Sequence, residues 1–339
     1  MKRNMSLDLL KILSCFAVVV LHVSGIITTT NNENTISHII YYTAGFAVPI
    51  FFMVNGYLLL NKEKITYKYI LKKVVNILSV IFLWNIVIFL DNLILKGEIV
   101  NPFKMLLRNL IQRDYFWQFW FFGALILIYC VLPIIHKYFT EFKTAILITS
   151  TFITISLLID LISLIRSFSG NSIIQINVME TFRLWTWFSY YLIGGLLGKK
   201  QTRDYILKHI SPLVNWIILI TMIIIINIYQ YNVGHYLYKT PSGEYFYENV
   251  FTFIWTVSLF VLVYRQNFSK YKNKTIEVIS NNAMGIYIIH VTILNIMRRF
   301  YEFNTVITNI LLIFIVFSIS LIASIIINKL PLVNRLVKI

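Results

Sequence analysis

The chain has 339 residues, of which 58% are hydrophobic and only 13% are charged. This composition excludes an ordinary soluble domain, in which about a quarter of the residues are charged. The net charge of +16 therefore indicates basic residues that flank membrane spans, and not a nucleic-acid partner. Both cysteines, Cys15 and Cys130, lie inside apolar runs. This excludes a disulfide framework, and we expect neither a metal nor a bound cofactor.

Apolar runs near the length of a bilayer crossing repeat along the chain. They predict an all-α, polytopic membrane protein with about ten transmembrane helices, because only helices and closed barrels satisfy the backbone inside a bilayer. We expect one membrane domain over residues 1–339, with no soluble domain appended. The eighth and ninth runs are short. The expected spans lie at residues 8–28, 39–60, 74–95, 119–136, 144–165, 182–198, 212–231, 250–264, 283–298 and 305–328.

The loops between these spans alternate in their content of basic residues. If the N-terminus lies inside, 20 of the 30 Lys and Arg residues fall in inside segments, nine fall in outside segments, and Lys11 falls within the first span. Basic residues are favoured on the cytoplasmic side. We therefore expect both termini in the cytoplasm.

The first span carries three ionisable residues, Asp8, Lys11 and His22. The spacings to His22 are close to three and four full helical turns, so the three residues share one face, and Asp8 and Lys11 are close enough to pair. Such a stripe must face protein or a water-filled cavity. His22 would lie about 16 Å from Lys11 along the axis. There a neutral imidazole could act as a general base or form a polar contact across the bundle.

A second group of candidates, Lys68, Lys72 and Lys73, lies where the chain enters the third span. A cytoplasmic basic cluster could bind an anionic, phosphate-bearing ligand. The ordinary excess of basic residues on the cytoplasmic side explains the same pattern.

The loops on the outer side, 96–118 and 232–249, are rich in aromatic residues. Aromatic rings beside carboxylates suit sugar binding, and an interfacial aromatic belt would have the same composition. Glu180 and Arg183 flank the outer end of the sixth span, where they could line an outward vestibule or pair with each other.

Further candidates lie within the spans. Trp120 opens the fourth span as an aromatic anchor or a channel wall. Tyr287 and His290 share one face of the ninth span, because they are three residues apart. Each could contact a substrate or serve only as a packed polar group.

Five landmarks, in this order along the chain, resemble the membrane-bound acyltransferase 3 family. The first is Lys11-x10-His22, preceded by Arg3-Asn4 and Asp8-Leu9-Leu10. The others are Phe51-Phe52-Met53-Val54-Asn55-Gly56-Tyr57, Trp120-Phe121, Tyr191-Leu192-Ile193-Gly194-Gly195 and Gly285-Ile286-Tyr287-Ile288-Ile289-His290.

The resemblance implies transfer of an acyl group, most simply acetyl, from cytoplasmic acyl-CoA to a cell-surface glycan or lipid-linked sugar. His22 would then be the catalytic histidine, assisted by Lys11 and Asp8, in a multi-pass protein of the bacterial cell membrane that could form a homo-oligomer. Acyl-CoA would be a co-substrate and not a bound cofactor.

The chain departs from the family pattern at three places. Members often have Arg-x-x-Arg at the third span, and this chain has Lys73 and then Asn76, which shifts the expected donor site to Lys68, Lys72 and Lys73. Asn55 stands where the second-span motif has a small hydroxyl residue, and we expect it to line the channel. Gln118 replaces a histidine often found before the tryptophan motif.

Other function classes remain open on the sequence alone. The chain has no phosphate-binding loop, dinucleotide fingerprint, metalloprotease motif or serine-hydrolase motif, so nothing supports ATP-driven transport or serine-hydrolase chemistry. The main alternative is a proton-coupled transporter or flippase that uses His22 and Lys11 as a relay. A glycan polymerase or ligase and a ligand sensor are weaker alternatives.

Overall fold

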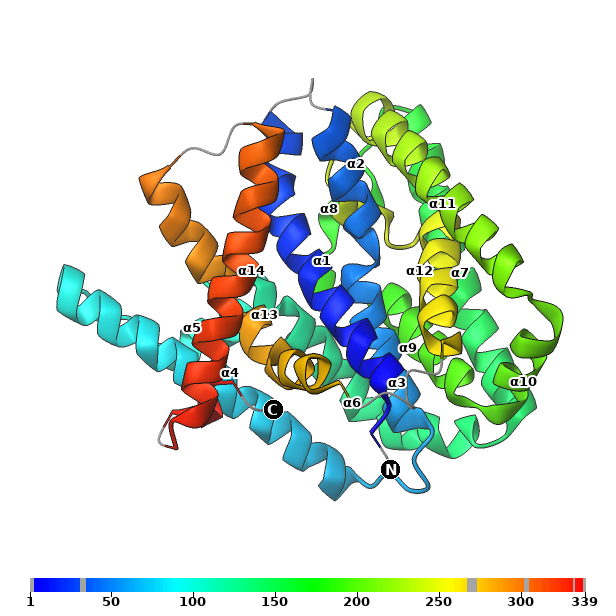
Figure 1. The fold of residues 1–339 in the computed structure, drawn as a ribbon, viewed down its shortest axis with the longest axis horizontal. Helices are drawn as coiled ribbons and strands as arrows, with labels where there is room; N and C mark the ends of the chain where they lie inside the picture. Colours follow the sequence, from blue (N-terminus) through cyan, green and yellow to red (C-terminus); the bar gives the residue numbers. More distant parts are fainter. Residues whose placement is uncertain (1–2, 31–34, 267–272, 302–304, 332, 338–339) are drawn as a thin grey trace.

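The computed structural model describes residues 3–30, 35–266, 273–301, 305–331 and 333–337, and this part of the chain contains helices and no strand (Figure 1). The all-α expectation is confirmed. The helices are α1 (Met5–Thr30), α2 (Thr35–Thr43), α3 (Ala47–Leu60), α4 (Tyr67–Lys96), α5 (Pro102–Leu110), α6 (Trp120–Phe139), α7 (Phe142–Phe168), α8 (Ile174–Asn177), α9 (Leu184–Gly198), α10 (Lys200–His209), α11 (Pro212–Asn232), α12 (Val250–Arg265), α13 (Lys274–Phe300) and α14 (Val306–Lys329).

Among the described residues, eight helical segments are long and apolar enough to cross a membrane. Each of the other two expected spans also contains a helix, but α12 has only 16 residues and α9 only 15. The protein is therefore a multi-pass membrane protein, and the count of ten crossings stays a prediction. The ninth expected span is not short, because α13 has 27 residues. The second is interrupted by a 3-10 turn, Ala44–Phe46, between α2 and α3.

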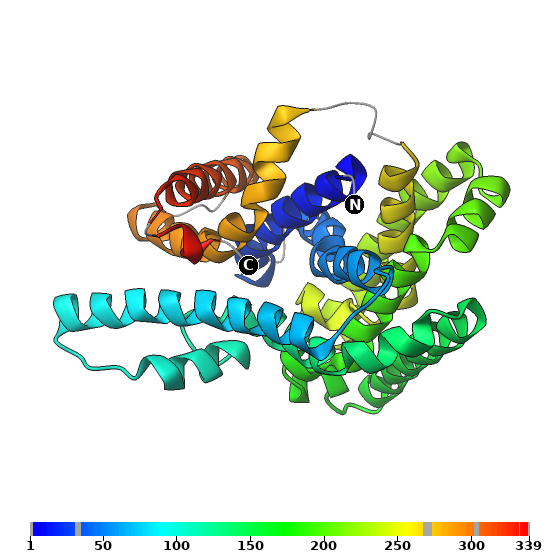
Figure 2. The same cartoon turned by 90° about the horizontal axis from the view of Figure 1, so that it is seen from below.

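Helix α1 lies in the middle of the bundle, where it contacts α2, α3, α12, α13 and α14 (Figure 1). The start of α1 and the end of α14 lie at the same end of the molecule, which Figure 2 views directly. An even number of crossings requires this arrangement. The side of the membrane on which this end lies stays a prediction.

Helices α3 and α9 pack closely because two glycines let their backbones touch. A Cβ atom on Gly56 would lie 1.8 Å from the carbonyl oxygen of Tyr191, and one on Gly194 would lie 2.0 Å from that of Met53. Neither position can carry a side chain without separating the helices. Two of the five sequence landmarks are thus the two halves of one helix contact.

Helices α4 and α5 form an arm along one side of the bundle (Figure 2). Buried Asn85 and Asn109 join the two helices through a hydrogen bond of 2.7 Å. Large apolar side chains, including Ile94 and Phe103, are exposed on this arm. Such a surface is stable only against lipid or another protein.

Candidate active site

Three cavities follow α1 from its start towards its end. We call them the lower, middle and upper cavities, in the orientation of Figure 1; their volumes are about 490, 260 and 410 Å³. The lower and middle cavities share Lys11 and Leu58, and the middle and upper cavities share Tyr287. The ionisable stripe of the first span therefore faces a row of cavities and not lipid.

Asp8 lines the lower cavity, where its buried carboxylate has three polar partners. Its carboxylate pairs with Arg3 Nε at 2.5 Å and with Lys11 Nζ at 3.5 Å. It also accepts a hydrogen bond of 2.7 Å from Ser280 Oγ. The expected pairing with Lys11 is confirmed. Arg3 extends the network to Glu277 at 3.0 Å, so Asp8 fixes the start of α1 against α13 and holds Lys11 between two cavities.

The middle cavity is walled mostly by apolar side chains, with Lys11 and Lys73 as its two cationic groups. Lys68 and Lys72 are exposed and line none of the three cavities. The expected cluster of three lysines is therefore divided, because Lys68 and Lys72, four residues apart, share the exposed face of α4, whereas Lys73 lines the cavity. Asn55 lines this cavity as expected, and its side-chain oxygen accepts a hydrogen bond of 3.1 Å from Tyr129.

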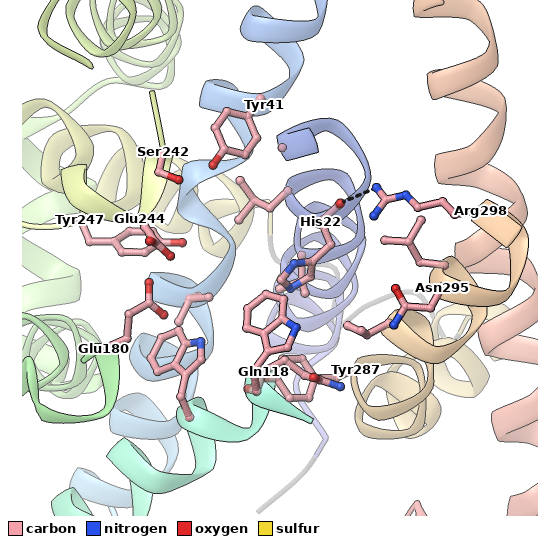
Figure 3. Close-up of a pocket in the computed structure, with 18 residues that line it drawn as sticks. His22, Tyr41, Gln118, Glu180, Ser242, Glu244, Tyr247, Tyr287, Asn295 and Arg298 are labelled. Atoms are coloured by element: carbon pink, nitrogen blue, oxygen red, sulfur yellow. Dashed lines mark hydrogen bonds between the residues drawn. The ribbon is translucent and has the colours of Figure 1, made fainter. Parts of the chain in front are cut away.

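His22 lines the upper cavity. Its imidazole packs edge-on against Trp117, with ring centroids 4.9 Å apart, and lies 5.0 Å from the ring of His290. Arg298 on α13 donates to the backbone carbonyl groups of His22 and Val23 at 3.2 and 3.4 Å (Figure 3). The imidazole therefore has a fixed environment and faces an open space that can admit a ligand.

His290 does not line the upper cavity but lies behind His22, fully buried. Its Nδ1 is 3.2 Å from the carbonyl oxygen of Ile286, so a neutral ring carries its proton on Nδ1. Its Nε2 has no hydrogen-bond partner among the described residues. Direct contact between His290 and a substrate, which the sequence left open, is not supported by this placement.

The wall opposite His22 is acidic and comes from two connecting segments. Glu180 precedes α9 and Glu244 lies between α11 and α12, and their carboxyl groups face each other (Figure 3). Burial, and then the neighbouring carboxylate of Glu244, raises the pKa of Glu180 well above its usual value. A glutamate whose pKa is raised keeps its proton to a higher pH than an ordinary glutamate, and in that form it can both donate and accept hydrogen bonds.

Arg183 is not part of this wall, and within the described chain it forms no ion pair with Glu180. Its guanidinium donates instead to the backbone carbonyl groups of Gln175, Val178 and Glu244, at 2.9, 3.0 and 2.8 Å. Arg183 therefore positions the segment that carries Glu244. Glu180 thus lines the cavity and Arg183 does not, so a vestibule role stays a prediction for Glu180 alone.

Trp120 and Tyr287 both line the upper cavity, as expected. The Trp120 ring packs against Trp187 at 5.0 Å. The hydroxyl of Tyr287 donates to the backbone carbonyl of Gln118. The start of the fourth expected span and the middle of the ninth therefore meet beside His22.

Several lining residues were not singled out from the sequence: Tyr41, Trp117, Ser242, Glu244, Asn295 and Arg298. One signal could have found Arg298, because Tyr287, Val291, Leu294 and Arg298 recur at helical spacing on one face. Its charge was instead attributed to a flanking loop. The groups from 41 and 242–247 come together only through the long connection before α12, which has no periodic pattern. No group of ligands suited to a metal ion occurs among the described residues.

The chain matches the family model described as an acyltransferase domain over residues 4–329, nearly its whole length. It belongs to the acyltransferase 3 family. The resemblance carried by the five landmarks is thereby confirmed, and the protein is a membrane acyltransferase. The search of curated proteins found no match, and neither did the search of solved structures.

Proposed function

We propose that the protein transfers an acyl group, acetyl in the simplest case, from acyl-CoA to a hydroxyl group of a cell-surface or lipid-linked glycan. The observation that carries the proposal is the row of three cavities along α1, which has lysines towards one end and His22 with a carboxyl pair at the other. A reaction that joins a donor from one side to an acceptor from the other needs such an arrangement.

The donor would enter from the lower end, which we place in the cytoplasm because basic residues gather there. Its pantetheine arm would lie in the middle cavity, where the walls are largely apolar. Lys73 and Lys11 would attract the anionic part of the donor. This assignment replaces the three-lysine donor site with Lys73 and Lys11, and leaves Lys68 and Lys72 to contribute only to the surface charge.

The acceptor would occupy the upper cavity between His22 and the carboxyl pair. Two neighbouring carboxyl groups can form hydrogen bonds with the hydroxyls of a sugar, and Trp117 and Trp120 offer apolar faces for a sugar ring. The segment 232–249, whose aromatic composition suggested sugar binding, contributes Ser242, Glu244 and Tyr247 to this wall.

His22 would act in one of two ways. As a general base it takes the hydroxyl proton while the oxygen attacks the thioester carbon; the carbon–sulfur bond breaks, and the imidazolium returns the proton to the departing thiolate. As an acyl carrier, its nitrogen attacks the thioester carbon, the carbon–sulfur bond breaks, and CoA leaves as a thiol with the imidazole proton; the acceptor hydroxyl then attacks the acyl group, and the departing imidazole takes up the hydroxyl proton. Acid trapping and mass analysis of the protein after brief exposure to labelled acetyl-CoA distinguishes the two, because only the second route leaves an acyl group on His22.

The same row of cavities would also serve the main alternative, a proton-coupled transporter or flippase. Purified protein incubated with acetyl-CoA and membranes that contain the acceptor separates the two functions. An acyltransferase releases free CoA, whereas a transporter leaves acetyl-CoA intact, and that result would overturn the proposal.

The acceptor can be identified in cells. Wall, capsule and lipid-linked glycans from wild-type and deletion strains would be compared by mass spectrometry. We expect one glycan class in the deletion strain to lose the mass of one acyl group, which identifies the acyl group and the acceptor together.

A further inference from the structure

Tyr287 holds a position that the reaction above does not use. Among the residues that line the middle and upper cavities, it is the one common to both. It belongs to α13, and Figure 3 shows it beside the space in front of His22. A ligand that extends from one cavity into the other must therefore pass its phenol ring.

The ring of Tyr287 is held on several sides. Its hydroxyl donates to the backbone carbonyl of Gln118. The rings of Phe121 and Phe122 contact it nearly edge-on, at 5.7 and 5.5 Å. Gln118 directly follows Trp117, whose ring packs on His22 at 4.9 Å. The phenol ring is thus linked to the wall around the His22 imidazole through its hydrogen bond to Gln118 and the adjacent Trp117.

The separation of the two cavities has a chemical consequence. If the Tyr287 ring closes the passage, a thioester in the middle cavity reaches His22 only when the ring moves aside, and water in the upper cavity has no path to the thioester while the ring is in place. Exclusion of water until the acceptor is bound prevents loss of the acyl group by hydrolysis. A ring that moves only partly would pass a short acyl chain more readily than a long one.

We propose that Tyr287 is the barrier between the donor and acceptor cavities, and that it determines which acyl groups reach His22 and protects the thioester from water. The barrier follows from the cavities alone, whereas its effect on acyl groups rests on the proposed function. The two parts therefore need separate experiments.

The barrier itself is tested by cysteine labelling, which requires no activity. Cys15 is buried and Cys130 is exposed, and both are first replaced by alanine. Ser242→Cys then reports on the upper cavity and Met284→Cys on the middle cavity, because each residue lines one of them only. A charged, membrane-impermeant thiol reagent is applied to sealed vesicles from the side on which Ser242→Cys reacts.

With Tyr287 present, we expect Met284→Cys to react slowly from that side. Tyr287→Ala should accelerate its labelling about tenfold, which corresponds to removal of about 1.4 kcal/mol of barrier. Phe51→Ala is the matched control, since Phe51 contacts Tyr287 at 6.2 Å but lines only the middle cavity; it should leave the labelling slow. Ser242→Cys must stay reactive in every variant, which verifies the fold, and Tyr287→Leu replaces Tyr287→Ala if the latter does not fold.

Rapid labelling of Met284→Cys with Tyr287 in place would overturn the barrier, as would labelling that stays slow after Tyr287→Ala. The second part is measured as hydrolysis of acetyl-CoA and hexanoyl-CoA without acceptor. Tyr287→Ala should raise both rates and raise the hexanoyl rate more, and equal rates in wild type and variant would contradict the effect on acyl groups. If the wild-type protein consumes no acyl-CoA even with acceptor, the proposed function fails while the labelling result still stands.

Discussion

The upper and middle cavities lie on the same helix yet differ in chemistry. The upper cavity gathers an imidazole, two carboxyl groups and a guanidinium from α1, α13 and two connecting segments. The middle cavity has aromatic and aliphatic walls, with Lys11 and Lys73 as its cationic groups. The first set of groups can transfer protons and orient hydroxyls, and the second can hold a long, partly anionic ligand. The proposed function assigns the reaction to the upper cavity and donor binding to the middle one, as this difference requires.

The largest expected effect comes from the residue that should matter only for the reaction. His22→Ala should lower acyl transfer by about 10²- to 10⁴-fold, the usual contribution of a general acid–base group. Donor affinity should change little, because His22 does not line the middle cavity. Transfer of labelled acetyl and equilibrium binding of acetyl-CoA measure the two quantities.

His290→Asn is the matched control for this prediction. His290 packs on His22 but does not line the cavity, so the loss of transfer should be clearly smaller. Equal losses in the two variants would contradict the assignment of the reaction to His22.

The next effect tests the middle cavity as the donor site. Lys73→Gln should raise the KM for acyl-CoA about tenfold, equivalent to about 1.4 kcal/mol of binding energy, with little change in kcat. Lys68→Gln and Lys72→Gln remove the same charge from exposed positions of the same helix and should leave KM nearly unchanged. Steady-state kinetics of CoA release measures KM and kcat for each of the three variants. Similar increases in all three variants would favour a diffuse surface attraction and would remove the distinction between the lysines.

The smallest effect concerns the carboxyl pair of the upper cavity. Because burial and Glu244 raise the pKa of Glu180, its neutral form favours the folded state below the ordinary pKa of a glutamate, and this stabilisation is lost as the pH rises through the raised value. The thermal midpoint of the purified protein should therefore fall as the pH rises above the ordinary pKa of a glutamate, and Glu180→Gln should flatten the fall. A decrease of the same size in wild type and variant would show that the titration of Glu180 does not contribute to the pH dependence of stability.

The sequence predicted the part of the site that lies on one helix. Asp8, Lys11 and His22 share a face by helical spacing, and charge in an apolar span requires a cavity or a partner. The same reasoning could not separate Lys73 from Lys68 and Lys72. Positive-inside topology produces that run of lysines whether or not any of them faces a ligand.

The far wall of the upper cavity could not be predicted for a different reason. Glu244 reaches the site through the irregular connection between α11 and α12, held by Arg183 through backbone carbonyl groups. Such long-range contacts leave no periodic signal. For the same reason Arg183 looked like a vestibule residue, although it is a structural support. The long helices were predictable from apolar runs, but the short helices α5 and α10 lie outside those runs and were not. The turn that divides the second span lies inside an apolar run and was not predictable either.

The central claim is that a donor from the Lys73 end meets an acceptor from the other side at His22. Sealed native membrane vesicles from producing cells, which carry their own acceptor, test it most directly when labelled acetyl-CoA is supplied outside. We expect label to enter the glycan in inside-out vesicles, not in right-side-out vesicles, and not in inside-out vesicles that carry His22→Ala. Incorporation in right-side-out vesicles, or undiminished incorporation with His22→Ala, would contradict the account.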